Sequence, residues 1–222
     1  MYKSLKNLKI FITAGSTWVP LDKVRVLTNI FSGRTGLSIA IQAANQGAKV
    51  VLALGPTRLQ VKNNIPNLKI IPFKYFDYLH KLVKKEISKK IYDVCIHSAA
   101  VSDYKPLNTS GGKIKSNKKH LTITFVPTIK IVDQIKKYDS DIVLVKFKLE
   151  VNKTRAKLLD IAKKSMLYSK ADFIVANDLL ELGNKHRAFI MDSFFNVTEV
   201  KGNKKLSIAL LKNINNFIHN KE

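Results

Sequence analysis

The sequence has few of the residues that mark secreted, metal-binding or membrane-spanning proteins. Its 222 residues include one cysteine, Cys95, which excludes an internal disulfide framework and any zinc site built from several cysteines. No apolar run approaches the roughly 18 residues that a membrane span needs. The first residues lack a signal-peptide core followed by a small-residue cleavage site. These absences predict a cytoplasmic protein with no membrane partner.

Acidic residues are also scarce. The chain has 39 Lys and Arg against 16 Asp and Glu, for a net charge of +23, and only five of the basic residues are arginines. A basic surface can bind nucleic acid, yet the chain shows no helix-turn-helix, RNA-binding aromatic signature or zinc-finger spacing. We interpret the charge as a lysine-rich composition, with no specific nucleic acid as a partner. A basic nucleic-acid-binding protein without catalysis stays as the alternative function.

The order of apolar segments predicts the fold class. Short strands and amphipathic helices alternate along the chain, which is typical of a doubly wound, mostly parallel sheet of the Rossmann-like α/β class. The expected strands are 9–13, 48–54, 69–73, 92–98, 121–125, 142–147 and 173–176. The expected helices are 35–46, 77–88, 128–137, 154–168 and 207–218. A small C-terminal hairpin is expected from 188–191 and 196–199.

One stretch interrupts this alternation. Residues 107–120 are rich in Gly, Ser, Asn and Lys and have little to bury, which predicts a flexible flap. We find no internal repeat and no interdomain linker, so residues 1–222 are expected to form a single domain.

Small and polar residues follow two of the expected strands, where ligands bind in open parallel sheets, and also surround the start of the first helix. Gly15-Ser16-Thr17 follows the first strand, Ser32-Gly33 and Gly36 surround the start of the first helix, and residues 97–104 follow a third strand. Backbone amides at such turns can bind phosphate. The first of these segments could also be only a tight turn, and the second only a helix cap. Within 97–104, Asp103 could hold a ribose, a base or a metal-bound water.

Two chemically reactive side chains are interpreted as core residues. Cys95 and His97 lie within the apolar strand 92–98, and we expect packing rather than catalysis from both. No His, Cys and Asp cluster has the spacing of a metal site, so no tightly held metal is expected.

Five segments, in this order, carry a resemblance to a known family. They read ITAGSTWVPLDKVRVLTNIFSGRTG, HSAAVSDYKP, GGKIK, FKLE and ADFIVANDLLE, and they extend over most of the chain from residue 12. The chain resembles the phosphopantothenate–cysteine ligases, in their stand-alone bacterial form. The ligase pattern begins by residue 9, so we expect no flavoprotein decarboxylase domain, which many bacteria fuse to this ligase.

The resemblance implies an enzyme that forms an amide in coenzyme A biosynthesis. In this family the carboxylate of 4′-phosphopantothenate attacks the α-phosphate of a nucleoside triphosphate, giving an acyl-nucleotide and pyrophosphate. The amine of L-cysteine then displaces the nucleoside monophosphate. The nucleotide is typically CTP in bacteria and ATP in eukaryotes, and Mg²⁺ accompanies it. The resemblance also implies a homodimer.

Roles for individual residues follow from their positions in the matching segments. The catalytic residues implied are Asn29 and Lys113, and those that contact phosphopantothenate are Arg25, Asn29, Ala99 and Ala100. The nucleotide contacts implied are Gly15, Ser16, Thr17, Ser32, Gly33, Gly36, Asp103, Lys113, Phe147 and Asn177.

The chain departs from the family pattern at positions implied to contact the nucleotide. Ser16 stands in the usual Gly-Gly-Thr turn, and Ser165 and Ser169 stand where two lysines are usual. Thr128 replaces the aspartate of a Pro-Asp pair. The choice between CTP and ATP therefore stays open. A nucleotide-sugar or short-chain oxidoreductase is the enzymatic alternative, but the chain lacks the G-x-x-G-x-x-G loop that it needs.

Overall fold

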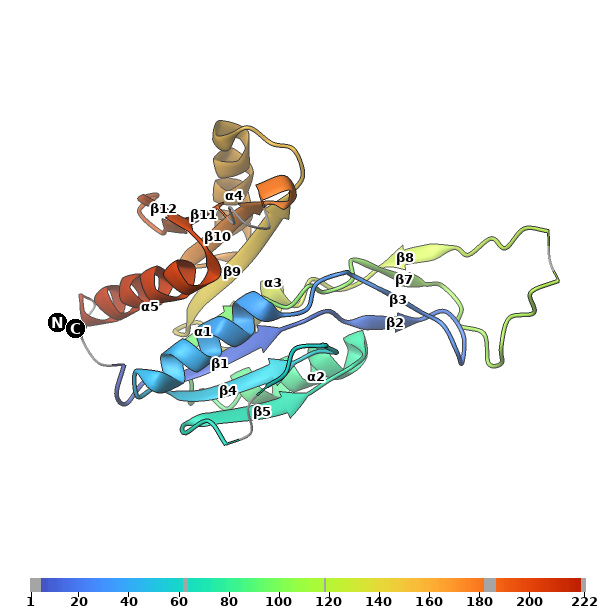
Figure 1. Ribbon diagram of the computed structural model, residues 1–222, viewed down its shortest axis with the longest axis horizontal. Coiled ribbons are helices and arrows are strands. Elements are labelled where there is room, and N and C mark those ends of the chain that lie inside the picture. Colours follow the sequence, from blue (N-terminus) through green and yellow to red (C-terminus); the bar gives the residue numbers. More distant parts are fainter. Residues whose placement is uncertain (1–4, 62–63, 118, 182–186, 221–222) are drawn as a thin grey trace.

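The computed structural model describes residues 5–61, 64–117, 119–181 and 187–220. Its centre is an eight-stranded sheet with the strand order β12-β11-β10-β9-β6-β1-β4-β5 (Figure 1). The six strands from β5 to β10 in that order are parallel, and β11 and β12 are antiparallel at one edge. This arrangement confirms the predicted Rossmann-like class. The strands are β1 Lys9–Ala14, β4 Lys49–Leu54, β5 Leu68–Pro72, β6 Val94–His97, β9 Val143–Glu150, β10 Phe173–Asp178, β11 Arg187–Asp192 and β12 Val197–Lys201.

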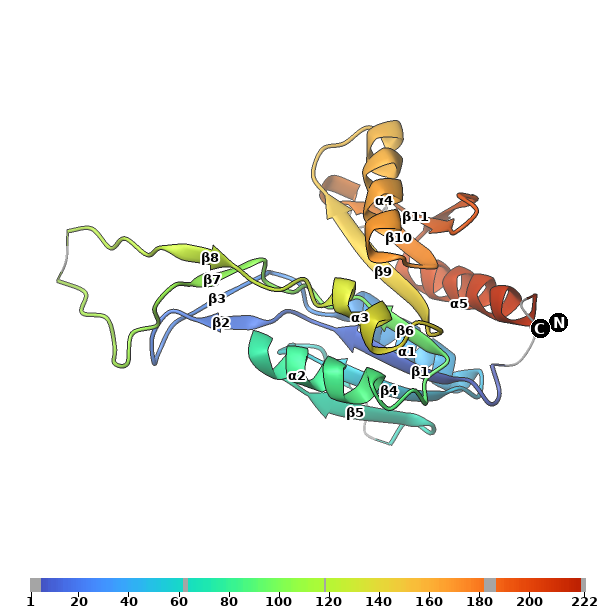
Figure 2. The ribbon, with the colours of Figure 1, turned by 180° about the vertical axis from the view of Figure 1, so that it is seen from behind.

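Helices cover both faces of this sheet. The first face packs against α1 Arg34–Asn45 and α5 Asn203–His219. The second packs against α2 Phe76–Ile87, α3 Val132–Tyr138 and α4 Arg155–Ser169, which lie in front in Figure 2. The central strands β6 and β10 are buried along their whole length, because helices cover them on both sides.

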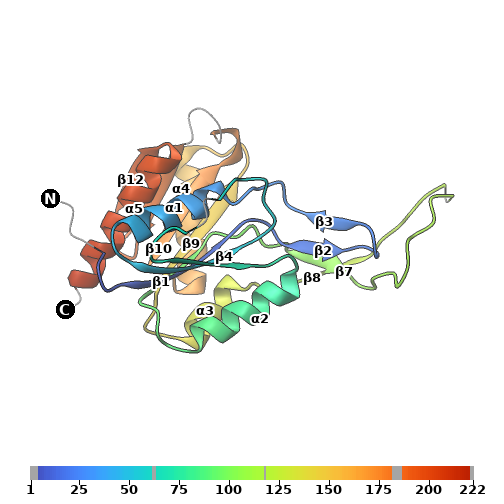
Figure 3. The ribbon, with the colours of Figure 1, turned by 60° about the horizontal axis from the view of Figure 1, so that its bottom comes forward.

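A long arm leaves the body at the carboxyl ends of β1 and β6 (Figures 1 and 3). It consists of two short antiparallel pairs, with β2 Trp18–Pro20 on β3 Val26–Thr28 and β7 Tyr104–Pro106 on β8 Phe125–Pro127. A backbone hydrogen bond from Ser110 N to Leu21 O joins the two pairs. The sequence patterns did not predict this arm.

Two predicted elements of this region need correction. The strand expected at 121–125 is wrong apart from its last residue, because 121–124 have no regular structure and only Phe125 enters β8. The helix expected at 128–137 begins only at Val132, since Thr128 is used to tie the chain to the arm. The described residues of the flap, 107–117 and 119–120, contain no helix or strand, while its flexibility stays a prediction.

The C-terminal hairpin is confirmed, and it has a definite place. β11 pairs with β10 and β12 with β11, so the hairpin extends the central sheet. The chain then crosses to α5, which runs alongside α1 and reaches the end of the pocket described next.

Candidate functional site

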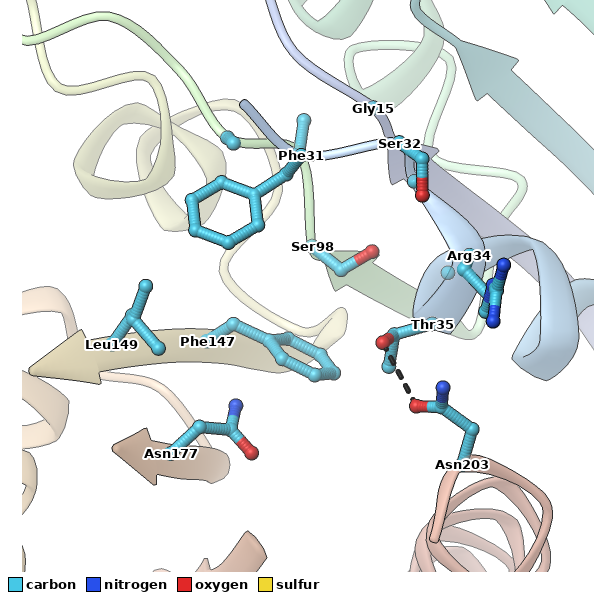
Figure 4. Close-up of a pocket in the computed structure, with 14 residues that line it drawn as sticks. Gly15, Phe31, Ser32, Arg34, Thr35, Ser98, Phe147, Leu149, Asn177 and Asn203 are labelled. Atoms are coloured by element: carbon cyan, nitrogen blue, oxygen red, sulfur yellow. Dashed lines mark hydrogen bonds between the residues drawn. The ribbon is translucent and has the colours of Figure 1, made fainter. Parts of the chain in front are cut away.

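A pocket of about 350 Å³ lies at the carboxyl ends of the central strands (Figure 4). Loops after β1 and β6, the start of α1, the ends of β9 and β10, and the first residue of α5 form its wall. Eight of the residues that the resemblance implied meet here: Gly15, Ser32, Gly33, Gly36, Ala99, Ala100, Phe147 and Asn177. Their roles as ligand contacts stay predictions.

Two glycines allow the backbone to fold tightly at the pocket. Gly15 and Gly33 have φ angles of 84° and 80°, which L-residues with a side chain rarely adopt. A Cβ atom on Gly33 would lie 2.7 Å from the backbone nitrogen of Gly15. The start of α1 is therefore pressed directly against the end of β1.

The start of α1 presents backbone donors to the pocket. Its N-cap residue is Gly33, which has no side chain to accept a hydrogen bond from the first-turn amides. Arg34, Thr35 and Gly36 of that turn line the pocket. Free amides and the positive end of a helix dipole favour an anion at this end of the pocket.

The opposite side of the pocket is aromatic and amide-bearing. The rings of Phe31 and Phe147 border the same space, with the side chain of Asn177 below them (Figure 4). Asn177 is only 7% exposed, and within the part of the chain that the structure describes its Oδ1 atom has no hydrogen-bond partner. A buried acceptor without a partner is costly, so a ligand with an N–H or O–H donor would be stabilised here.

Ser16 and Thr17, which the resemblance implied as nucleotide contacts, make hydrogen bonds at the base of the arm. Ser16 Oγ donates to the carbonyl of Phe31 at 2.9 Å, and Thr17 Oγ1 accepts from the amide of Ser102 at 2.9 Å. Both side chains are buried and neither lines the pocket.

Asn29 adjoins the pocket without lining it. Its Nδ2 atom donates to the carbonyl of Ala100 at 3.1 Å and to that of Val101 at 3.4 Å. These bonds join the approach to α1 to the segment after β6. Asn29 is exposed, so a bound molecule could reach its side chain.

Arg25 belongs to the arm. Its guanidinium pairs with Asp22 at 2.9 Å and donates to the carbonyl of Ile114. Asp22 was missed by the sequence patterns, and it is the anchor of this region. A hydrogen bond from the Ile114 amide, reinforced by those from Val24 and Arg25, lowers the pKa of Asp22 to about 2. Asp22 therefore fixes the flap beside Lys113.

Lys113 and Asp103 lie outside the pocket wall. Lys113 is exposed on the segment between β7 and β8, next to Ile114, whose amide binds Asp22. Asp103 is more than half exposed and pairs with Lys130, while its carbonyl accepts from the amide of Thr128. The structure thus does not bring these two residues together with the other eight.

The serines of α4 do not face the pocket. Ser169 is buried near the amino-terminal end of β10, at the opposite end of the sheet. The ammonium group of Lys146 donates to Ser169 Oγ at 2.8 Å and to the carbonyl of Ser165 at 3.0 Å. Burial lowers the pKa of Lys146. The neighbouring Lys164 pairs with Asp160 on the surface.

Cys95 and His97 are core residues, as predicted. Burial raises the pKa of the Cys95 thiol, which disfavours the reactive thiolate. His97 shares a 2.9 Å hydrogen bond with the hydroxyl of Thr13. Burial, reinforced by the nearby charge of Lys146, lowers the pKa of His97 to about 4.

We expect His97 to make the fold sensitive to acid. In the unfolded chain the imidazole binds a proton below its ordinary pKa of 6.5, whereas in the folded protein it stays neutral down to about 4. Between these values the unfolded state binds more protons, so acidification lowers the free energy of unfolding. From pH 7 to pH 5 the loss is about 2 kcal/mol. Urea unfolding of the wild type and His97→Asn at both pH values measures it. An equal pH dependence in the two proteins would contradict the assignment.

Several lining residues were missed by sequence reasoning. They are Phe31, Arg34, Thr35, Ser98, Leu149 and Asn203. Phe31 and Arg34 lie next to Ser32 and Gly33, which the sequence had already indicated as site residues, so both could have been predicted. No sequence feature near Asn203 indicates a site, because it reaches the pocket only through the packing of α5 on α1.

The fold and the pocket define a doubly wound α/β protein with a ligand-sized cavity at the carboxyl ends of its strands. The family model of the DNA/pantothenate metabolism flavoprotein C-terminal domain matches residues 5–218. The chain belongs to this family, and its resemblance to the phosphopantothenate–cysteine ligases is confirmed.

Named relatives agree with this membership. The coenzyme A biosynthesis bifunctional protein CoaBC of Thermococcus kodakarensis is 31% identical over 191 residues, which cover 85% of this chain and 46% of the relative. The crystal structure of the DNA/pantothenate metabolism flavoprotein from Streptococcus pneumoniae superposes with a TM-score of 0.86 at 29% identity, covering 95% of this chain and 99% of that one. That of the C-terminal domain of CoaBC gives 0.79 at 27% identity, with 97% of both chains covered. The chain spans about half the length of the curated relatives it matches.

None of the helices among the described residues has the length and apolar character needed to cross a membrane. Over the same residues, no three His, Cys, Asp or Glu side chains gather as ligands for a metal ion.

Proposed function

We propose that this chain is a phosphopantothenate–cysteine ligase, which joins L-cysteine to 4′-phosphopantothenate through an acyl-nucleotide. The observation that carries the proposal is the meeting of eight family-implied residues around one pocket, although they come from segments spread between Gly15 and Asn177. Membership of a family that includes coenzyme A biosynthesis proteins supports the same reaction. We also propose that the protein acts in the cytoplasm.

The proposed reaction divides into two displacements. The substrate carboxylate attacks the α-phosphorus, a P–O bond to the β-phosphate breaks, and pyrophosphate leaves with the electron pair. The amides at the start of α1 would stabilise the charge that moves to the phosphate oxygens. The cysteine amine then attacks the acyl carbon, and the nucleoside monophosphate leaves as the amide forms and a proton is released.

The remaining wall suits the other parts of the substrates. Phe31 and Phe147 offer apolar ring surface to the base or ribose, and Asn177 Oδ1 offers an acceptor to a donor on either. The small side chains of Ala99 and Ala100 allow close approach of the acyl group. We propose that Asn29, whose Nδ2 atom donates to the carbonyl of Ala100 at the edge of the pocket, contacts phosphopantothenate.

Mg²⁺ fits this site as part of the nucleotide. The described residues that line the pocket include no Asp or Glu, so the wall itself lacks the carboxylates that bind Mg²⁺ most strongly. Phosphate oxygens and water would hold the ion, which would neutralise part of the triphosphate charge. We propose CTP as the preferred nucleotide, with ATP as the alternative.

A homodimer is also proposed, and the surface of the arm supports it. Apolar side chains of the arm are exposed, among them Val24 at 66%, Ile30 at 87% and Tyr104 at 58%. A second copy would remove this surface from water. Closure of the flap, or the arrival of the partner's arm, would bring a Lys113 ammonium to the phosphates.

Pyrophosphate release tests the proposed reaction. Purified protein is given phosphopantothenate and Mg²⁺ with either CTP or ATP, before and after L-cysteine is added. With CTP, we expect about one pyrophosphate to be released per enzyme molecule before cysteine is added. After cysteine is added, we expect pyrophosphate release to continue over many turnovers. Folded protein that releases no pyrophosphate with either nucleotide would contradict the proposed function.

A further inference from the structure

The start of α5 lies beside the start of α1 at the pocket. Thr35 Oγ1 donates to Oδ1 of Asn203 at 3.0 Å, and one turn further along, the hydroxyls of Ser38 and Ser207 are 3.0 Å apart. Because the second contact lies one turn later than the first in both helices, α1 and α5 run in the same direction. Their amino-terminal ends therefore open together on the same side of the pocket (Figure 4).

The charges at these two helix starts are the reverse of those that stabilise a helix alone. A helix dipole favours acidic residues in the first turn. Here α1 begins with Arg34, and α5 begins Asn203-Lys204-Lys205. Neither helix has a side-chain cap on its first amides. A bound anion would offset the repulsion between the positive ends of the two helix dipoles and the cationic side chains beside them.

The same pocket also contains a buried acceptor that a ligand could satisfy. The side chain of Asn177 is more than nine-tenths buried and points into the pocket (Figure 4). Its Oδ1 atom has no hydrogen-bond partner among the described residues. This acceptor lies on the wall formed by β9 and β10, apart from the donors at the helix starts.

We propose that Asn203 is a phosphate-binding residue, whose Nδ2 group donates to the terminal phosphates of the nucleoside triphosphate. The proposal rests on the proposed function and extends it to a helix that the family resemblance left out. The Thr35 hydroxyl donates to Oδ1 of Asn203 and so fixes the orientation of this amide, whose Nδ2 group can then donate to a ligand. The side chain of Arg34 lies on the same side of the pocket (Figure 4). Together they form the subsite from which pyrophosphate leaves.

Asn203→Asp separates this role from a structural one. Aspartate keeps an acceptor for Thr35 and suits the start of a helix, so the melting temperature of the ligand-free variant should equal or exceed that of the wild type. It also replaces the Nδ2 donor with a carboxylate oxygen, which repels phosphate. Asn216→Asp is the matched control, because Asn216 is exposed near the other end of α5.

Calorimetric titration with CTP, ATP, CMP, AMP and phosphopantothenate in the presence of Mg²⁺ measures the effect. We expect Asn203→Asp to weaken binding of the preferred triphosphate at least tenfold, and that of its monophosphate less than threefold. Equal triphosphate affinities in Asn203→Asp and Asn216→Asp would overturn the inference about Asn203 but not the proposed function. The same holds if Asn203→Asp weakens the binding of phosphopantothenate only. If the wild type binds none of the five probes, both the inference and the proposed function fail.

Discussion

Asn29→Asp is expected to lower the rate of amide formation by on the order of 100-fold, while the fold stays intact. The Nδ2 atom of Asn29 now donates to the carbonyls of Ala100 and Val101. A carboxylate oxygen in its place would face two carbonyl oxygens and could donate to neither. It would also repel the carboxylate and phosphate groups of the proposed substrates. Because Asn29 is exposed, this repulsion acts mainly on the site and little on the core.

The measurement compares the yield of phosphopantothenoylcysteine, followed by mass spectrometry, with the release of pyrophosphate. Asn216→Asp again controls for the added charge, since it makes the same substitution away from the pocket. A wild-type rate of product formation in Asn29→Asp would remove Asn29 from the site. A loss of rate accompanied by a large drop in melting temperature would point to a structural role instead.

The central sheet was predictable because burial dictates its sequence. β1, β6 and β10 are nearly continuous apolar runs, as parallel strands covered on both faces must be. The four strands of the arm are only three residues long, and residues of each remain partly or fully exposed. Their pairing depends on contacts such as those of Asp22 with Ile114, which join residues 92 apart. No local pattern reports a contact of that kind.

The pocket was predictable only in part, for a related reason. Residues such as Gly33 and Ala99 could be found because glycine and small residues at strand ends have a local geometric meaning, and because the family resemblance singled them out. Asn203 comes 168 residues after Thr35, and nothing near it in the sequence marks a site. Thr17 is the reverse case: its place in a phosphate-type turn is visible in the sequence, whereas the hydrogen bond that its buried hydroxyl accepts from the Ser102 amide is not.

Gly36→Ala is expected to destabilise the fold by about 3 kcal/mol and to weaken nucleotide binding with it. Helix propensity alone would favour alanine by roughly 1 kcal/mol at such a position. However, a Cβ atom on Gly36 would lie 2.4 Å from Ser98 Oγ and 2.5 Å from the Cβ of Ala14. Ser98 Oγ is held by a 2.7 Å hydrogen bond to the carbonyl of Thr13, and the Ala14 methyl group cannot rotate away. The first turn of α1 must therefore move outward.

That displacement links stability to the site. The turn that would move includes Arg34 and Thr35, which line the pocket, and the Thr35 hydroxyl also binds the side chain of Asn203. In Gly36→Ala, urea unfolding should therefore show a lower free energy of unfolding, and calorimetric titration should show a weaker affinity for the triphosphate. Gly111→Ala and Gly112→Ala are the controls, because a Cβ atom at either flap position meets nothing within 4 Å. If Gly36→Ala proved as stable as these two, the close packing of α1 against β1 and β6 would be wrong, and with it the anion-binding geometry that this packing creates.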